Sequence, residues 1–211
     1  MKIGVIGSGS VGQVLAKGLK AAGHDVRVGS RSGDKLASFA AETGMAEGKN
    51  TDVIAFADVV VLAIKGDVAE AFAREHAAAL AGKVVLDTTN PIGGPPKDGV
   101  VQYFTAGGES LIERVQRAAP KARVVKWMNS VGAPLMVKPQ LKGGTPAMFI
   151  CGNDDDAKKT AATLSAELGW HAEDVGGAGI GHAVEALCQL WCAPGFLRND
   201  WAHAFAMLRP G

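Results

Sequence analysis

The sequence lacks the features that mark membrane, secreted and nucleic-acid-binding proteins. None of its apolar runs is long enough to span a bilayer, and the N-terminus does not read as a secretory signal. The 22 Lys and Arg residues are balanced by 21 Asp and Glu, so the charge gives no reason to expect a nucleic-acid or membrane partner. These absences predict a globular, cytoplasmic protein.

Cysteine is also scarce, and no set of residues typical of metal binding or hydrolysis is recognisable. Cys151, Cys188 and Cys192 are the only cysteines, and the last two would share one face of a helix. They could pair or bind a metal, but no further Cys or His cluster completes a ligand set, which favours buried reduced thiols. No Ser-His-Asp set or pair of carboxylates stands out either. The sequence therefore assigns no metal site and no catalytic residue.

The first twelve residues, MKIGVIGSGSVG, carry the clearest motif. An apolar run predicts a strand, three glycines in the pattern G-x-G-x-x-G follow it, and an amphipathic helical pattern comes next, which is the order of a dinucleotide-binding fingerprint. Gly7 allows the tight turn, Gly9 leaves room for a pyrophosphate, and Gly12 lets the helix pack closely on the strand. The amides of this turn would point at the phosphates from the positive end of the helix dipole. The predicted cofactor-binding residues here are Gly7, Ser8, Gly9, Ser10, Val11 and Gly12.

The residues after the second predicted strand, Asp25–Val28, indicate which cofactor is bound. NAD-binding folds usually have an acid at this position, to bond the ribose hydroxyls. This chain has Ser30, Arg31 and Ser32, with Lys35 following, and no acid before Asp34. A guanidinium, an ammonium and hydroxyls suit a 2′-phosphate, so we expect NADP(H) as the cofactor.

The rest of the chain alternates apolar runs with helical patterns, which predicts an α/β fold. We expect a Rossmann-type, doubly wound, mostly parallel sheet, with residues 1–175 as the dinucleotide-binding domain. Residues 176–211 are predicted as a helical C-terminal segment that packs on this domain or on a dimer partner. The aromatic residues from Trp191 to Phe205 fit a core, a dimer contact or a wall for a flat ring.

The individual elements are predicted as follows. Predicted strands are Asp58–Ile64, Lys83–Asp87, Arg123–Trp127 and Ala147–Cys151. Predicted helices are Asp34–Ala41, Lys49–Ala57, Val68–Leu80, Glu109–Ala119, a stretch ending at Leu168, and His182–Cys192; Ile92–Gly99 is predicted as a loop.

Polar residues follow several of these strands. In a doubly wound sheet the carboxyl ends of the strands near the switch point line the ligand crevice. Ile64, Lys65, Thr88, Asn90 and Pro91 should therefore flank the ribose and nicotinamide. Asn129 leaves the end of another strand at the same edge of the sheet.

The chain resembles the deazaflavin-dependent (coenzyme F420) NADP oxidoreductases and the reductase domain of the STEAP metalloreductases. The resemblance is carried by IGSGSVG, VGSRS with Lys35, VVVLAIK, VVKWMNSVGAP and MFICGNDDDAKK. It implies that the 64–68 turn, with Val68, and the 88–91 turn hold the ribose and nicotinamide. It also implies that Asn129 to Ala133 lie near the ring, with Asn129 as the candidate ring contact. Lys65 stands where relatives often have Pro.

Three functions fit the sequence. The first is hydride transfer between NADPH and a deazaflavin or flavin (FAD or FMN), which needs two rings held face to face and no general base. The second is NADPH-dependent reduction of a small imine or carbonyl compound, for which Tyr103, Lys65 or His182 would have to supply a proton. The third is a non-catalytic NADPH-sensing module. We expect a homodimer in each case.

Overall fold

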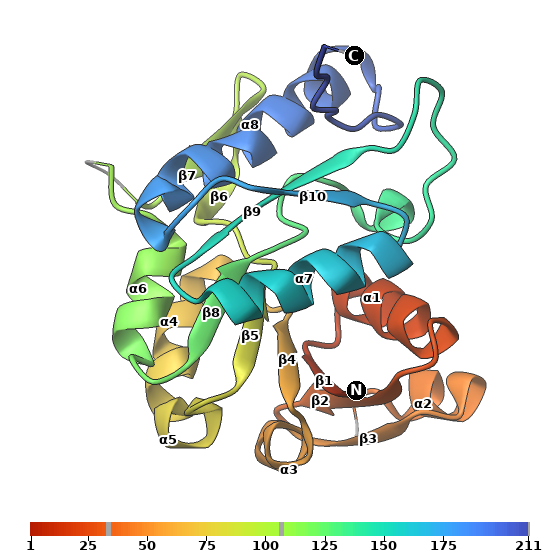
Figure 1. Cartoon of the computed structure of the whole chain (residues 1–211), viewed down its shortest axis with the longest axis vertical. Coiled ribbons are helices and arrows are strands. Elements are labelled where there is room, and N and C mark those ends of the chain that lie inside the picture. Colours follow the sequence, from red (N-terminus) through yellow and green to blue (C-terminus); the bar gives the residue numbers. More distant parts are fainter. Residues whose placement is uncertain (33–34, 106–107, 211) are drawn as a thin grey trace.

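The computed structural model describes residues 1–32, 35–105 and 108–210, and a single large sheet organises them (Figure 1). Six parallel strands form its main part. The strand order changes direction between the neighbouring strands β1 and β4, because the chain passes from β3, at one edge, to β4 beside β1. Two more strands extend the sheet past β8: β9 runs antiparallel to β8, and β10 runs parallel to β9. In spatial order the strands are β3 (Ala46–Lys49), β2 (Asp25–Ser30), β1 (Lys2–Ile6), β4 (Val59–Leu62), β5 (Val84–Asp87), β8 (Arg123–Lys126), β9 (Ala147–Gly152) and β10 (His171–Asp174). The predicted Rossmann-type, mostly parallel α/β fold is confirmed.

Helices cover both faces of this sheet, as in other doubly wound folds. One buried cluster joins Leu15 and Leu19 of α1 with Leu164 of α7, and a second joins Ile54 of α3 with Ile112 of α6. The strands between them are buried on both sides, which explains their continuous apolar runs. The helices are α1 (Ser10–Ala21), α2 (Ala37–Thr43), α3 (Asn50–Phe56), α4 (Gly66–Glu75), α5 (Ala77–Leu80), α6 (Leu111–Ala118), α7 (Asp155–Glu167) and α8 (Gly181–Arg198), with short 3₁₀ turns at Ala133–Leu135 and Ala178–Ile180. No helix among the described residues is long and apolar enough to cross a membrane.

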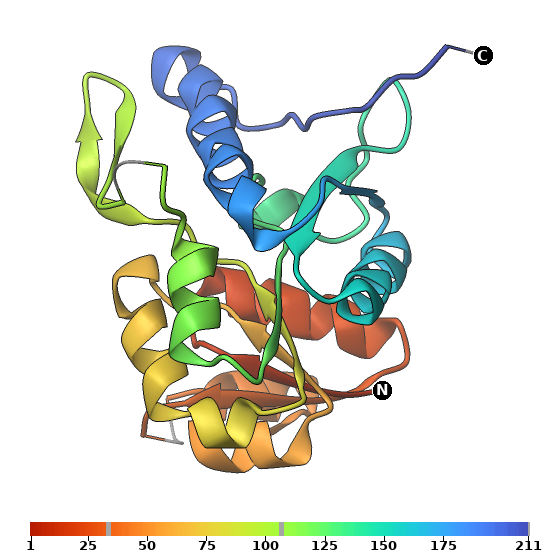
Figure 2. The ribbon, with the colours of Figure 1, turned by 60° about the vertical axis from the view of Figure 1, so that its left-hand side comes forward.

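The prediction of a loop over Ile92–Gly99 is wrong. These residues begin a β-hairpin in which β6 (Ile92–Lys97) pairs antiparallel with β7 (Val100–Tyr103) (Figure 2). The turn residues Asp98 and Gly99 both have positive φ, 52° and 77°, as a two-residue hairpin turn requires. Two register shifts interrupt the pairing of β6, and the second, between Gly94 and Lys97, contains both prolines of the strand, which therefore disturb the ladder there without preventing the hairpin.

The limits of three predicted helices differ from the structure by more than two residues or by a break, whereas Lys49–Ala57 and Glu109–Ala119 are shortened only to Asn50–Phe56 and Leu111–Ala118. The stretch Val68–Leu80 forms two helices, because the helix breaks at His76 between α4 and α5. Helix α8 continues through Pro194, beyond the predicted end at Cys192, and stops where Asn199 takes a positive φ. Helix α2 begins at Ala37, and the predicted first residue, Asp34, lies outside the described residues.

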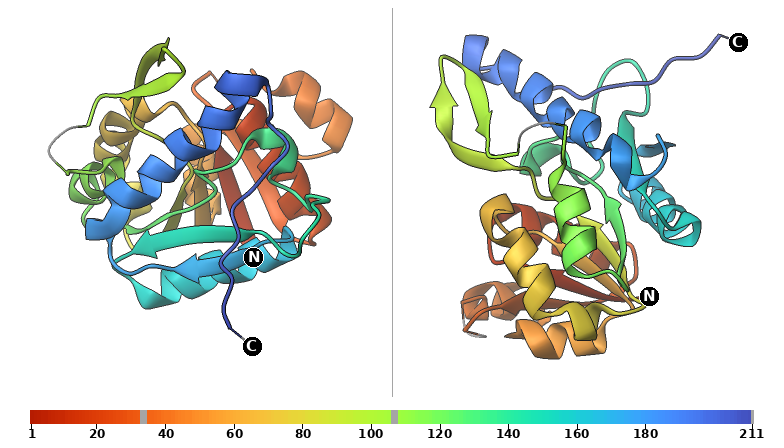
Figure 3. Two further views of the ribbon diagram at one scale, coloured as in Figure 1. Left: turned by 90° about the horizontal axis from the view of Figure 1, so that it is seen from above. Right: turned by 90° about the vertical axis from the view of Figure 1, so that its left-hand side faces the viewer.

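The segment after α8 folds back over the outer strands of the sheet (Figure 3). The indole of Trp191 donates to the carbonyl of His203, and the amide of Ala147 donates to the carbonyl of Phe205. Arg209 then forms two hydrogen bonds, of 2.8 and 2.7 Å, to the carboxylate of Glu173 on β10. The predicted contact of this segment with a second copy stays a prediction.

Candidate functional site

The turn between β1 and α1 is packed closely at two of its glycines and open at the third. Gly7 has φ +132°, and a Cβ there would overlap the carbonyl of Ala63. A Cβ on Gly12 would overlap the carbonyl of Gly7, so close packing of helix and strand needs glycine there. Around Gly9, by contrast, a Cβ would meet no described atom within 4 Å. This open space lies at the N-terminus of α1, whose first turn contains no acid, so the turn can take an anion.

Positive residues gather beside this turn, at the ends of β2 and β3. Ser30 ends β2 and is 5% exposed, while Arg31, Ser32 and Lys35 are exposed after it. The register pairs Ser30 with Lys49 of β3, so the exposed Lys49 joins the residues expected to bind the 2′-phosphate. Lys49 was not predicted, because its strand, AEGK, has no apolar run and was missed in the sequence.

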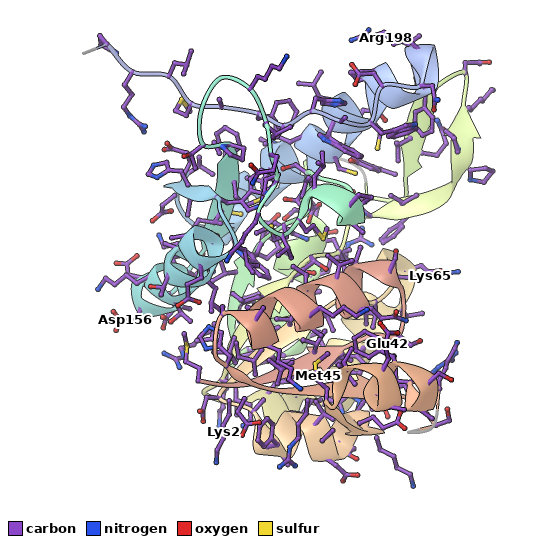
Figure 4. The ribbon with its side chains drawn as sticks, turned by 90° about the vertical axis from the view of Figure 1, so that its right-hand side faces the viewer. Lys2, Glu42, Met45, Lys65, Asp156 and Arg198 are labelled. Carbon is purple, nitrogen blue, oxygen red and sulfur yellow. The ribbon has the colours of Figure 1, made fainter. Side chains whose placement is uncertain are left out.

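The turns after β4 and β5 lie against one another. A Cβ on Gly66, the first residue of α4, would overlap the carbonyl of Asn90, so glycine allows this contact. Thr88 is tied to β4, because its hydroxyl donates to the carbonyl of Leu62 at 3.0 Å. Lys65 points outward beside the first turn of α1 (Figure 4). The structure thus brings together the two turns that the sequence places at the ribose and nicotinamide, with Ile64 half-buried, Pro91 buried and Val68 exposed on α4.

Asn129 lies at the same edge, where its Nδ2 is bound to other protein atoms and its Oδ1 is buried without a hydrogen-bond partner among the described residues. Its Nδ2 donates to Asn90 Oδ1 at 3.1 Å and to the carbonyl of Val184 on α8 at 3.0 Å. Asn90 returns a hydrogen bond of 2.8 Å to the carbonyl of Asn129. Asn129 is 3% exposed and Asn90 is half-exposed. Asn90 is therefore the member of this amide pair that solvent can reach at the carboxyl edge of the sheet. The preceding Met128, fully buried, has φ 51°, a strained conformation of the kind that often occurs at functional sites.

A buried cluster of three charges lies directly behind these residues. Lys126 Nζ lies 2.6 Å from Asp87 Oδ2 and 2.9 Å from Glu185 Oε1, and donates at 2.9 Å to the carbonyl of Thr89. Burial lowers the pKa of Lys126, but the two carboxylates outweigh this effect and hold that pKa above its usual value. All three side chains are at most 2% exposed. The sequence did not reveal this cluster, because Glu185 is 59 positions beyond Lys126 and belongs to another element.

The possible proton donors are less well placed than the amides. The hydroxyl of Tyr103 donates to the carbonyl of Glu185 at 2.7 Å, and burial raises the pKa of this phenol above its usual value. Lys65 and His182 are exposed. For none of these three side chains does the structure therefore show a proton donor that faces Asn90 and Asn129.

Comparison with known proteins identifies the family. A solved structure from Arthrobacter sp. FB24, described as a candidate F420-dependent NADP-reductase, matches 99% of this chain and 100% of its own, with a TM-score of 0.90 and 32% sequence identity. The chain belongs to the coenzyme F420-dependent NADP oxidoreductase family. The model of this family, "NADP oxidoreductase coenzyme F420-dependent", matches residues 2–91. The predicted resemblance is confirmed.

Two curated relatives agree with this assignment over most of the chain. The F420-dependent NADP reductase of Methanothermobacter thermautotrophicus is 27% identical over 203 residues, which is 90% of this chain and 87% of that protein. Rat metalloreductase STEAP3 is 28% identical over 88% of this chain, but the chain spans only 36% of STEAP3. The family model covers the turn between β1 and α1, the cationic residues after β2 and β3, and the turns after β4 and β5, whereas Lys126, Asn129 and Glu185 lie beyond it.

Proposed function

We propose that the protein transfers a hydride between NADPH and a deazaflavin or flavin. The observation that carries the NADP part is the open space at Gly9, flanked by the cationic ends of β2 and β3. The residues proposed to bind NADP(H) are Gly7, Ser8, Gly9, Ser10, Val11, Gly12, Ser30, Arg31, Ser32, Lys35, Ile64, Lys65, Val68, Thr88, Asn90, Pro91, Asn129 and Ala133, with Lys49 added from the structure.

The protein's part in the reaction is to bind and orient. The backbone amides of the first turn of α1 hold the pyrophosphate, and Arg31, Lys35 and Lys49 hold the 2′-phosphate. Bound NADPH supplies a hydride from C4 of its nicotinamide, and the acceptor ring takes this hydride together with a proton from solvent. Asn90, held by Asn129, keeps the edge of the sheet in place beside the ring.

The acceptor is inferred from two observations. The relative from Methanothermobacter is named an F420-dependent NADP reductase, and it matches nearly the whole chain. The edge around Asn90 and Asn129 presents amides, which suits two stacked rings better than a carbonyl that must be protonated. Reduction of a small imine or carbonyl compound is the second candidate, and its support is limited to Tyr103, Lys65 and His182.

The test is an NADPH oxidation assay with coenzyme F420, FAD, FMN and a panel of small imines and ketones. Under single-turnover conditions, NADPH deuterated at C4 should pass its label to C5 of the deazaflavin. A flavin exchanges the label with water, so a primary isotope effect is the readout for FAD and FMN. Robust reduction of an imine or ketone, with no transfer to either ring system, would instead establish the second candidate. Binding of NADPH without turnover would indicate a sensing module.

A further inference from the structure

The charges of the Asp87–Lys126–Glu185 cluster do not cancel. Both oxygens of Glu185 accept hydrogen bonds: Oε2 from the amide of Leu111, and Oε1 from the amide of Ile112 and from Lys126. Both oxygens of Asp87 also accept, from Lys126 and from the amide of Thr89. Every hydrogen bond that these two carboxyl groups form among the described residues is accepted from a donor, and none is given to an acceptor, which fits two ionised carboxylates. Two carboxylates and one ammonium leave one excess negative charge in the interior.

The surroundings offset this charge only in part. The two amides that bind Glu185 belong to the first turn of α6, and the N-terminus of a helix contributes about half a positive charge. The neighbouring thiol of Cys151 adds no charge, since burial raises its pKa to about 12. Glu185 and Asp87 are 1% and 0% exposed, so solvent screens the remaining negative charge poorly.

The cluster lies directly behind the edge that is proposed to hold the nicotinamide. Asp87 and Lys126 are paired in register at the carboxyl ends of β5 and β8. Lys126 also binds the carbonyl of Thr89, the residue before Asn90. Glu185 follows Val184, whose carbonyl binds Asn129. One residue therefore separates the cluster from each member of the amide pair.

We propose that the excess carboxylate of this cluster tunes the hydride-transfer site, by favouring the cationic nicotinamide of NADP⁺ over the neutral nicotinamide of NADPH. The inference rests on the proposed function, because it needs the nicotinamide beside Asn90. Its consequence is that bound NADPH is a stronger hydride donor than NADPH in solution. Asp87, Lys126 and Glu185 are positioning residues here, since they act on the ring through space and through the amide pair without touching it.

The test compares the affinities of the two oxidation states, with no acceptor present. NADP⁺ and NADPH carry the same adenosine, phosphates and ribose, so the ratio of their dissociation constants reports the surroundings of the ring. Glu185→Gln and Asp87→Asn each remove one negative charge with little change of shape. A unit charge roughly 10 Å away, at an effective dielectric constant of about 20, changes an equilibrium on the order of tenfold. With α6 and solvent offsetting part of it, the ratio Kd(NADP⁺)/Kd(NADPH) should rise about three- to tenfold in each variant.

Glu113→Gln is the matched control. Glu113 lies on the same helix α6, where its carboxylate accepts from the amide of Ser110 in the capping box, but it is half-exposed. This variant weakens the same helix end and removes the same charge at a site open to solvent. Its ratio should stay within about twofold of that of the unmodified protein. Thermal melting of all four proteins shows which variants are folded.

A folded variant of Glu185 or Asp87 that binds both nucleotides with an unchanged ratio would overturn the inference. So would an equal rise in the control, because the effect would then come from the helix end. If neither variant folds, the unmodified protein decides: it should bind NADP⁺ more tightly than NADPH, and tighter binding of NADPH would refute the inference. A protein that binds neither nucleotide would refute the proposed function instead.

Discussion

Replacement of Gly9 by Val separates a nucleotide-binding role of the opening turn from a purely structural one. Gly9 has φ −79° and ψ 176°, which valine adopts readily, and a Cβ would meet no described atom within 4 Å. Gly9 is also the N-cap residue of α1, where an apolar side chain costs about 1 kcal/mol of stability. The variant should therefore fold, with only a small loss of stability.

The same side chain should abolish tight nucleotide binding, because it fills the space expected for the pyrophosphate. If two charge-assisted hydrogen bonds from the first turn of α1 are lost, the cost is about 3–6 kcal/mol, or on the order of a hundredfold or more in Kd. Calorimetric titration with NADPH measures this loss, and urea unfolding measures stability. Normal NADPH binding by Gly9→Val would show that the phosphates do not pass over this turn.

Two further substitutions complete this experiment. Gly179→Val is the matched control, since a Cβ at Gly179 also meets no described atom within 4 Å; this variant should bind NADPH normally. Gly7→Ala should behave in the opposite way to Gly9→Val. Its positive φ and the overlap with Ala63 predict a clear loss of stability even without ligand.

Arg31→Ala should weaken NADPH by about 1–3 kcal/mol while leaving NADH nearly unchanged, and equal affinities of the unmodified protein for the two nucleotides would disprove the 2′-phosphate assignment. Asn129→Leu removes both hydrogen bonds of Nδ2, so turnover should fall more than NADPH affinity; a loss confined to affinity would argue against a positioning role. Arg209 lowers the pKa of Glu173, so their contact stabilises the C-terminal segment above the ordinary Glu pKa of about 4.3 and is lost as the pH falls through the lowered pKa; hydrogen-exchange protection factors, which are corrected for the intrinsic pH dependence of exchange, should therefore fall in this segment in acid, and protection factors that do not change with pH would contradict this. Removal of the residues after Pro194 takes away the aromatic contacts of the chain's end and should reduce solubility and disrupt the proposed homodimer, whereas an active, monodisperse truncated protein would count against both roles of this segment.

The inner strands could be predicted because burial on both faces leaves a pattern in the sequence. Strands β4 and β5 are apolar at nearly every position, and all of their residues are buried. Strands β3 and β10 form the two edges of the sheet, are partly exposed, and read as the polar segments AEGK and HAED. An edge strand has only one neighbour and needs no apolar run, so local periodicity does not find it.

The residues of the candidate site also form two groups: those that a local sequence motif reveals, and those that are brought there by tertiary contacts. The glycines and Arg31 form local motifs whose chemistry depends on residues a few positions apart, so their roles could be predicted. Lys49 depends on the pairing of an edge strand, and the contact of Lys126 with Glu185 depends on where α8 crosses the sheet. Neither arrangement leaves a periodic pattern, because both depend on tertiary contacts between distant segments.

The position of Glu185 also limits how the chain can be divided into independent folding units. A fragment that ended at residue 175 would keep the whole large sheet, but it would lose α8. The buried amides of Leu111 and Ile112 and the side chain of Asn129 would then have no acceptor on α8, and Lys126 would lose one of its two carboxylates. Each of these hydrogen bonds contributes about 0.5–1.5 kcal/mol, more where a charged group takes part, and the apolar surface beneath α8 would also be exposed. We therefore expect a fragment that ends at residue 175 to be much less stable than the whole chain, because α8 supplies acceptors to groups on the sheet and on α6.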